Sequence, residues 1–464
     1  MPAEFSFLVK AENDGQLPVF PGELVRGMFL DVIASKDPKL ATYLHDYPKI
    51  KPYAIKPLAP TNKRKRVKNN SWVIRKGDLF KLSFSILIDN LIEKVEQILI
   101  DLDNFTLANV KFSVVEPPNI KKQLYQSFKA REIKAFLLDF RTPVAFKAIE
   151  EKYINPFPEP SRILRSMIRI YSAFSGEEEP VKPPDSIEVM GYRIKTREIF
   201  SMGLKFIGSE GWVLYRVIGE SKDLSKLLQL APFSNIGIKR TLGLGVLRVR
   251  MFEEYDKKIL RGFVRREKFQ RKRPQNPINV LKVRENRTDF IKITIEKKEK
   301  AIGFRECKKI METLKIDLPA KLKDGKLILL TRNKRDINKI IDNIGALVGY
   351  EITITNVEVI KPRIKGKKIR VYFITPTKLK SGFPSVEAVF KSIYEKMNIT
   401  KDIKNSIYVK MADLLAKEEG FTGVVEYIFS KDLEKLEEAI VELLINGIGL
   451  NVTRCGGTIE IEEL

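Results

Sequence analysis

Histidine, cysteine and long apolar runs are scarce in this sequence. Its 464 residues include one histidine and two cysteines. Cys307 and Cys455 stand far apart, with no CxxC pair and no histidine near either, so neither a disulfide framework nor a zinc site is expected. No stretch of about 18 apolar residues occurs, and the first residues, MPAEFSFLVKAEND, lack the apolar run of a signal peptide. The sequence therefore predicts a protein of the reducing cytoplasm that is neither secreted nor membrane-spanning.

Negative charge is also in deficit. The chain has 84 Lys and Arg against 59 Asp and Glu, a net charge of +25. A competing explanation is the Lys- and Glu-rich surface of a thermophile protein, but such a surface gains both positive and negative residues and does not by itself create this excess of positive charge. The asymmetry therefore favours a polyanionic partner, with nucleic acid as the leading candidate. Because no pair of carboxylates stands near other ligands, a two-metal nuclease is not favoured, and we expect no metal and no other cofactor.

Hydrophobic periodicity predicts an α+β fold of several domains. Hydrophobic residues make up 44% of the chain, and 464 residues are more than one domain with a single core ordinarily contains. Strand-like and helix-like patterns alternate over residues 4–116 as in a split βαβ, ferredoxin-like unit, and the rhythm resumes at Ile133. We expect one ferredoxin-like domain over 1–125 and a second over 126–255. The predicted helices of these two domains cover 22–36, 91–100, 161–174 and 222–231.

Internal repeats extend this pattern to the rest of the chain. A basic, proline-ended stretch over 256–277 is predicted to be a linker, followed by ferredoxin-like domains over 278–362 and 363–464. Three segments recur in the same order, which indicates duplication of a two-domain module. The pairs are FRTPVAFK (140–147) with FITPTKLK (373–380), GWVLYRVIGESKDLSKLL (211–228) with GFTGVVEYIFSKDLEKLEEA (420–439), and IGIKRTLGLG (236–245) with IGLNVTRCGG (448–457). The expected fold is thus tandem ferredoxin-like (RRM-like, βαββαβ) domains, two per module, in two modules.

Three basic features are candidates for RNA contact. In the glycine-rich loop, glycine permits positive φ and close approach to phosphate, while two cations add charge. A plain tight turn is the competing interpretation, and no Walker or dinucleotide motif is present. Three arginines at helical spacing could track a phosphate backbone or form a solvated helix face. A run of cations at 61–70 is typical of a mobile hairpin tip or of an exposed loop. The candidate residues are Gly237, Lys239, Arg240, Gly243 and Gly245 in the loop, Arg162, Arg165 and Arg169 on the helix, and Lys63, Arg64, Lys65 and Arg66 at the tip.

His45 is the only histidine in the chain. A lone histidine is more often structural than catalytic. Metal-free RNA cleavage, however, requires a base for the 2′-hydroxyl proton, an acid for the leaving 5′-oxygen and a cation for the developing charge. Histidine suits proton transfer near neutral pH, and Lys51, six residues on, could supply the cation.

These residues resemble a known family, the CRISPR-associated repeat-RNA endoribonucleases (the sixth Cas family, within the repeat-associated mysterious protein superfamily). Residues 17–58 resemble the family's N-terminal segment, in which a histidine follows the first helix and a lysine comes shortly after; His45 and Lys51 match these positions. The segments FRTPVAFK, NPFPEPSRILRSMIRIYSAF and NIGIKRTLGLGVLRV resemble its second domain and its glycine-rich signature. The resemblance spans about residues 1–252.

The resemblance implies metal-independent cleavage of precursor CRISPR RNA within the repeat, leaving a 2′,3′-cyclic phosphate. Many members have a tyrosine in the first helix where this chain has Leu30, with Tyr43, Tyr47 and Tyr53 nearby as possible replacements. The second module contains no histidine and has Asn451 and Val452 in place of the loop cations, so we expect it to be non-catalytic. The rival hypothesis, which Leu30 favours, is a catalytically impaired RNA-binding subunit that holds the repeat end of crRNA in a CRISPR interference complex.

Overall fold

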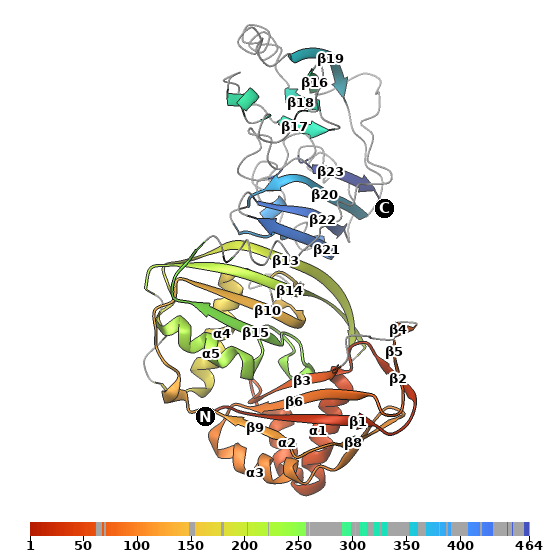
Figure 1. Cartoon of the computed structure of the whole chain (residues 1–464), viewed down its shortest axis with the longest axis vertical. Helices are drawn as coiled ribbons and strands as arrows, with labels where there is room; N and C mark the ends of the chain where they lie inside the picture. The colour runs from red at the N-terminus through yellow and green to blue at the C-terminus, as the bar shows by residue number, and fades with distance from the viewer. Residues whose placement is uncertain are drawn as a thin grey trace. The chain divides into compact units, whose positions relative to one another are not determined.

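The structure is a computed structural model of the chain (Figure 1). It describes most of the first 256 residues and, beyond them, mainly strands. The candidate cations Lys63, Arg64, Lys65 and Arg66 lie outside the described residues, as do most of the linker and most of the loop over 448–457. The described residues are 1–61, 67–68, 71–147, 154–177, 181–201, 203–220, 222–256, 259, 290–297, 302, 307, 309–312, 320–323, 326–331, 352–360, 368–379, 381–386, 388–390, 407–417, 420–429, 443, 448 and 459–463.

The chain divides into two compact units. Unit 1 comprises Met1–Glu150, Ile154–Glu188 and Thr196–Asp256, and unit 2 comprises the remainder. Both combine helical segments with antiparallel sheets, which confirms the predicted α+β class. None of the helices over the described residues is long and apolar enough to cross a membrane. The domain boundaries near residues 125, 255, 277 and 362 stay predictions.

The first domain of unit 1 has the strand order of a ferredoxin-like fold. Its main sheet runs β3-β6-β1-β8-β7, with β9 also paired to β1. The chain visits β1, α1, β3, β6, α3 and β8 in turn, so its first and third strands lie side by side at the centre. The elements are β1 (Ala3–Ala11), β2 (Gly15–Pro18), α1 (Gly22–Lys36), α2 (Pro38–Asp46), β3 (Tyr53–Pro60), β4 (Val67–Lys68), β5 (Ser71–Ile74), β6 (Leu79–Ile86), α3 (Asp89–Ile100), β7 (Asn104–Leu107), β8 (Val110–Val114) and β9 (Asn119–Lys122).

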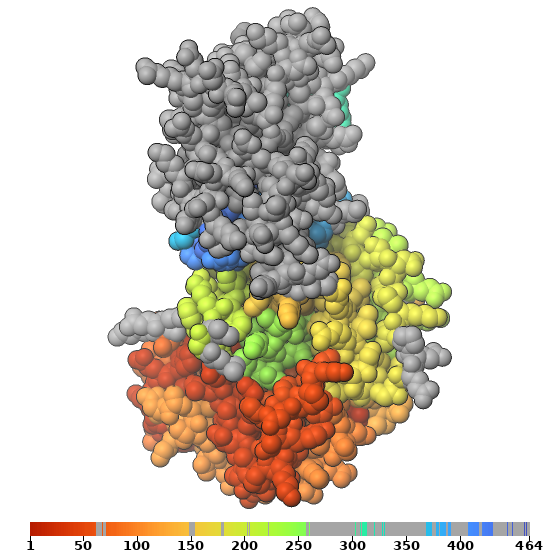
Figure 2. Space-filling model, turned by 180° about the vertical axis from the view of Figure 1, so that it is seen from behind, coloured from red at the N-terminus to blue at the C-terminus, as the bar shows by residue number. Residues whose placement is uncertain are grey.

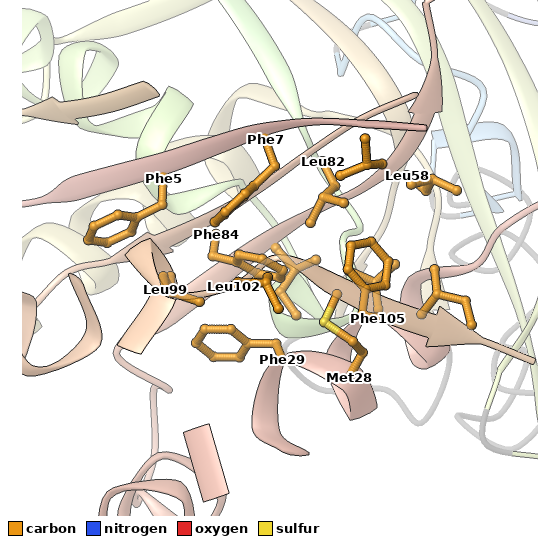
Figure 3. Close-up of a cluster of buried hydrophobic side chains, with 14 of the residues drawn as sticks. Phe5, Phe7, Met28, Phe29, Leu58, Leu82, Phe84, Leu99, Leu102 and Phe105 are labelled. Atoms are coloured by element: carbon orange, nitrogen blue, oxygen red, sulfur yellow. The ribbon is translucent and has the colours of Figure 1, made fainter. Parts of the chain in front are cut away.

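The core of this domain lies between the sheet and helices α1 and α3 (Figure 3). Alternate residues of β1 are buried, as a strand with one face on a core requires. Phe84 of β6 is central: its ring stacks on that of Phe29 at 4.7 Å and meets Phe7 edge-on at 5.9 Å. These aromatic contacts hold α1 on the sheet.

The second domain of unit 1 repeats the topology. Its four strands have the order β15-β10-β14-β13, with α4 and α5 in the crossover connections, and the middle of β13, Val189–Lys195, is counted in unit 2. The predicted helices over 161–174 and 222–231 correspond to α4 and α5. The elements are β10 (Ala135–Val144), β11 (Phe146–Lys147), β12 (Ile154–Asn155), α4 (Pro160–Phe174), β13 (Ser186–Ser201), β14 (Leu204–Ile218), α5 (Lys222–Ser234), the short 3-10 turn η2 (Arg240–Leu242) and β15 (Leu247–Phe252).

Unit 2 contains two more sets of four strands with the same order. In each, strands one to four of a ferredoxin-like unit are arranged 2-3-1-4, as β17-β18-β16-β19 and as β21-β22-β20-β23. The strands are β16 (Phe290–Lys297), β17 (Ala320–Lys323), β18 (Lys326–Thr331), β19 (Ile352–Ile360), β20 (Lys368–Thr377), β21 (Ile407–Lys417), β22 (Gly420–Phe429) and β23 (Ile459–Glu463).

The repeated segments occupy equivalent strands. The β10–β14 pairing shifts register between Phe140 and Val144, and the β20–β22 pairing shifts at the same offset, between Phe373 and Thr377. Each shift spans a Thr-Pro pair. Proline has no N–H to donate to the neighbouring strand, so the regular pairing is interrupted there. Opposite these phenylalanines stand Gly211 and Gly423. Gly423 is therefore the structural counterpart of Gly211. The sequence comparison had instead paired Gly211 with Gly420, three residues earlier.

The cysteine expectation needs correction. Cys307 is buried and disulfide-bonded. The sequence holds one other cysteine, Cys455, which lies outside the described residues. Spacing along the chain could not reveal the bond, because it does not measure distance in the fold.

Candidate functional site

A basic cavity of about 470 Å³ lies within unit 1, where the turn after α2, helix α4 and the glycine-rich loop meet. Eight of its fifteen lining residues are Lys or Arg, and none of these fifteen is acidic. Walls of one charge sign focus the electrostatic potential and attract a polyanion. The fifteen residues are Lys49, Ile50, Lys51, Phe146, Lys147, Arg162, Arg165, Ser166, Arg169, Ile170, Gly237, Ile238, Lys239, Arg240 and Thr241.

The two domains of unit 1 both contribute to this cavity. Lys49 and Lys51 come from the first domain, and the other cations come from the second. In Figure 2, green atoms of the second domain lie directly against red and orange atoms of the first. The site therefore exists only in the folded two-domain unit.

His45 lies in the last turn of α2, a helix that the sequence pattern did not predict. The helix begins where Asp37 accepts a hydrogen bond from the Leu40 amide at 2.9 Å, with Pro38 in the first turn. It ends before Pro48, which disfavours helical backbone at Tyr47. The His45 side chain is 59% exposed, with Nδ1 at 2.8 Å from the Asp46 carboxylate. The imidazole is thus accessible to a substrate.

Lys51 links the cavity to His45. Its ammonium donates hydrogen bonds to the carbonyl oxygens of His45 and, at 2.8 Å, of Tyr47, at the carboxyl end of α2. Cations stabilise this end of a helix, where carbonyls lack helical partners. Burial lowers the pKa of Lys51, and the nearby Arg26 charge lowers it further, while Asp46 raises it. The structure therefore brings the Lys51 ammonium to the backbone of His45.

The three helix arginines line the same cavity but differ in exposure. Arg165 and Arg169 are exposed on α4. Arg162 is 8% exposed, and its Nε donates a hydrogen bond at 2.8 Å to the Glu159 carboxylate. Arg162 therefore does not share the exposed face of Arg165 and Arg169, because the local acid draws its guanidinium inward; its assignment as an RNA contact stays a prediction.

The glycine-rich loop adopts the left-handed backbone that its glycines predict. Gly237, Gly243 and Gly245 have φ of 89°, 81° and 70°. A Cβ on Gly245 would lie 1.8 Å from the carbonyl oxygen of Ile236, and one on Gly243 would lie 2.5 Å from Pro57. The glycines thus allow the loop to pack against itself and against β3 of the first domain.

The amides of these glycines already have partners inside the protein. The N–H groups of Gly237, Gly243 and Gly245 donate to Ser166 Oγ, to the Arg240 carbonyl and to the Pro143 carbonyl at 2.9–3.0 Å. Phosphate binding by these amides would require breaking hydrogen bonds. Their assignment as RNA contacts stays a prediction, while their close packing is a property of the structure.

Lys239 and Arg240, adjacent in sequence, point in different directions. Lys239 has φ 53° and is exposed, with its ammonium 5.7 Å from the ring centre of Phe206. Arg240 is 7% exposed, and burial followed by the Arg169 charge lowers its pKa to about 10. Of this pair, Lys239 alone presents its charge to solvent.

Burial decides which tyrosine near His45 could take the place of the helix-one tyrosine. Leu30 packs against the core of the first domain. Tyr53 is fully buried, and its hydroxyl accepts a hydrogen bond from Arg26 Nε at 3.3 Å, so it cannot reach a substrate. Tyr43 is 46% exposed and packs edge-on against Tyr47 with ring centres 5.3 Å apart. These two remain the accessible tyrosines near His45.

Sequence reasoning missed three basic residues. Lys49 and Lys147 line the cavity, and Arg26 contributes its charge to Lys51. Lys49 lies at φ 60°, within the turn between α2 and β3. Lys147 ends FRTPVAFK and so lay within a recognised motif. Arg26 is on α1, and sequence gave no signal that this helix approaches Lys51.

Known proteins match part of this chain. The family model "CRISPR-associated endoribonuclease Cas6" matches residues 138–247. A CRISPR-associated endoribonuclease Cas6 of Mycobacterium tuberculosis is 30% identical over 142 residues, which are 28% of this chain and 44% of that protein. The chain thus spans less than half the length of the curated relatives that it matches.

Solved structures give matches over about half of the chain. A Cas6 of Thermus thermophilus is 21% identical, with a TM-score of 0.40, over 54% of this chain and 98% of that one. A Cas6-related protein of Pyrococcus furiosus is 15% identical, with a TM-score of 0.41, over 55% and 99%.

The match at residues 138–247 contains α4 and the glycine-rich loop, and so most of the basic residues that line the cavity. The resemblance first drawn from FRTPVAFK and NIGIKRTLGLGVLRV is thereby confirmed for this stretch. Residues 138–247 carry the sequence signature of the CRISPR-associated endoribonuclease Cas6 family.

Proposed function

We propose that this protein is a CRISPR precursor-RNA processing endoribonuclease that cleaves within the repeat. The observation that carries the proposal is the juxtaposition in unit 1 of a basic cavity with the end of the helix that carries the exposed His45. The Lys51 ammonium, which lines the cavity, is hydrogen-bonded to the carbonyl oxygen of His45. A family match over the second half of unit 1 supports the same reading.

In the proposed reaction, a ribose 2′-oxygen attacks the adjacent phosphorus as it loses its proton. The 5′-oxygen leaves and receives a proton, so the products are a 2′,3′-cyclic phosphate and a 5′-hydroxyl. His45 serves as general acid or base, for which its exposed imidazole is suited. Lys51 stabilises the negative charge that develops on the phosphorane oxygens. The proposal requires no metal ion.

The cations of the cavity would bind the RNA backbone. Arg165, Arg169 and Lys239 are exposed and line the cavity. Their contacts with phosphates would release counterions, so binding is expected to weaken as salt increases. We place the reaction in the cytoplasm, with repeat RNA as substrate and subunits of a CRISPR effector complex as recipients of the product.

One observation favours a second function. Leu30 packs against the core where many related enzymes have a helix-one tyrosine, which leaves His45 and Lys51 without that side chain. The alternative is a catalytically impaired RNA-binding subunit that grips the repeat end of crRNA in an interference complex.

The deciding experiment is incubation of the purified full chain with its labelled cognate repeat RNA in EDTA at high temperature, followed by mass spectrometry of the products. We expect one cut within the repeat and a 2′,3′-cyclic phosphate end. RNA that stays bound and intact would support the alternative subunit. Cleavage that EDTA abolishes would contradict the metal-independent mechanism.

A further inference from the structure

Arg240 stands out because it combines a cationic side chain with nearly complete burial. It begins η2, whose flanking residues Lys239 and Gly243 are both in the left-handed region at φ 53° and 81°. This backbone turns Lys239 outward and Arg240 inward. A buried guanidinium is costly unless its donors are paired. The hydrogen bonds of Arg240 therefore indicate what its burial achieves.

The Arg240 guanidinium donates hydrogen bonds to two backbone carbonyls. Nη1 donates to the Ser234 carbonyl at 2.7 Å, within its own domain. Nη2 donates to the Lys51 carbonyl at 3.0 Å, in the first domain. One planar side chain thus joins the end of α5 to the segment that leads from α2 into β3. Guanidinium suits this task, because its donors form a rigid fork.

The contact with Lys51 lies close to the proposed chemistry. The Lys51 carbonyl is held by Arg240, and the Lys51 ammonium is held by the carbonyls of His45 and Tyr47. A continuous path of hydrogen bonds therefore runs from the glycine-rich loop to the end of the helix that carries His45.

A second side chain strengthens the same junction. Asn235, fully buried at φ 55°, donates from Nδ2 to the Ile55 carbonyl of β3 at 2.9 Å and to the Arg240 carbonyl at 3.4 Å. A Cβ on Gly22 would lie 1.8 Å from the Leu242 carbonyl oxygen, so the loop also touches the start of α1. The loop is thus fixed on the first domain on both sides of Arg240.

We propose that Arg240 is a positioning residue that holds the His45–Lys51 segment in its reactive geometry from the neighbouring domain, rather than a contact for RNA. This inference rests on the proposed nuclease function for its kinetic consequence, but not for its structural one. It assigns the glycine-rich loop two tasks: Lys239 faces the RNA, and Arg240 faces the catalytic segment.

The test compares Arg240→Met, Arg240→Lys and two controls in the full chain. Arg248→Met removes an exposed arginine of β15 and should change nothing measured here. Lys239→Met removes the outward cation and should weaken RNA binding. The measurements are the single-turnover cleavage rate at saturating protein, the Kd for repeat RNA, and amide hydrogen exchange over residues 45–53.

For Arg240→Met we expect the saturated cleavage rate to fall about 10- to 100-fold, because small displacements of reacting groups have effects of this size. Its Kd should stay within about threefold of wild type, since the guanidinium does not face the RNA. Amides over 45–53 should exchange faster, while those of β1 and β6 should not, because only the tethered segment loosens. Arg240→Lys, which can restore one donor, should recover part of the rate.

Two results would overturn the inference. One is a weakened Kd in Arg240→Met with an unchanged saturated rate, which would make Arg240 an RNA contact. The other is unchanged exchange over 45–53, which refutes the positioning role even if wild type proves not to cleave RNA. If wild type does not cleave but exchange rises as expected, the proposed nuclease function fails and the positioning role stands. Should Arg240→Met not fold, Arg240→Lys is measured in its place against the same criteria.

Discussion

The second and fourth ferredoxin-like domains share their framework and differ in their chemistry. Both have a register shift that spans a Thr-Pro pair and begins at a phenylalanine opposite a glycine. Both also bury a tyrosine four residues after that glycine: Tyr215 donates to the Pro158 carbonyl at 2.7 Å, and Tyr427 donates to the Pro384 carbonyl at 2.8 Å. Each of these prolines lies just before a helical segment. The two domains thus share a contact between the sheet and the segment before a helix.

The difference between the two domains lies in side chains that could act on RNA. In the matching sequence segment, Asn451 takes the position of the exposed Lys239, and the single histidine of the sequence is in unit 1. Framework residues are retained because burial makes their loss costly, whereas exposed cations can be replaced without loss of fold. Shared topology therefore says little about whether a module is catalytic.

The largest effect expected is from His45→Ala, which would remove from unit 1 the side chain that unit 2 lacks. The cleavage rate should fall about 10²- to 10⁴-fold, the usual contribution of a general acid or base. The Kd for repeat RNA should change little, because His45 is not among the residues that line the basic cavity. Single-turnover kinetics and fluorescence anisotropy on the same preparations measure both quantities. An undiminished rate would remove His45 from the mechanism.

Next in size is the loss of the shared tyrosine contact, tested by Tyr215→Phe and Tyr427→Phe. Each change leaves a proline carbonyl without its donor, which should lower the free energy of unfolding of that domain by about 1–3 kcal/mol. Hydrogen exchange of β14 and of β22 reports the two domains separately. Comparable losses would support a common framework. A loss in one domain alone would mean that the two contacts are not equivalent.

The smallest effect concerns the pH dependence of cleavage, a property that only the histidine-bearing module should show. Lys51 must be protonated to stabilise the transition state, and its pKa is lowered by burial and by the Arg26 charge. The rate should therefore decline with rising pH before an ordinary lysine would lose its proton. Arg26→Met removes one of the two causes, so the pKa of Lys51 should rise and the alkaline limb should move to higher pH.

Profiles of kcat/KM against pH for wild type and Arg26→Met measure this shift. Lys76→Met, which removes an exposed cation outside the cavity lining, is the control and should leave the limb in place. If the alkaline limb of the pH profile stays in place in Arg26→Met, or moves to lower pH, then loss of the Lys51 proton is not the cause of that limb.

Much of the fold followed from periodicity. Helices α1, α3, α4 and α5 lie where apolar spacing predicted them. The helix that bears His45 was missed, because α2 has nine residues and is defined by Asp37, Pro38 and Pro48 rather than by a long apolar stripe. At the candidate site, the residue types and their rough grouping were predictable. Which arginines face solvent was not, because that depends on acceptors such as Glu159 and the Lys51 carbonyl.

The sequence by itself determined the α+β class, the excess of positive charge, the positions that must be glycine, and the single histidine. These are local or compositional properties, set by backbone freedom, side-chain period and residue counts. Only the tertiary structure decided that Lys51, α4 and the glycine-rich loop surround one cavity, and that Arg240 binds the backbone of the first domain instead of facing outward. Such relations join residues far apart in the chain, and their direction is fixed by which buried donors find acceptors when the two domains pack together.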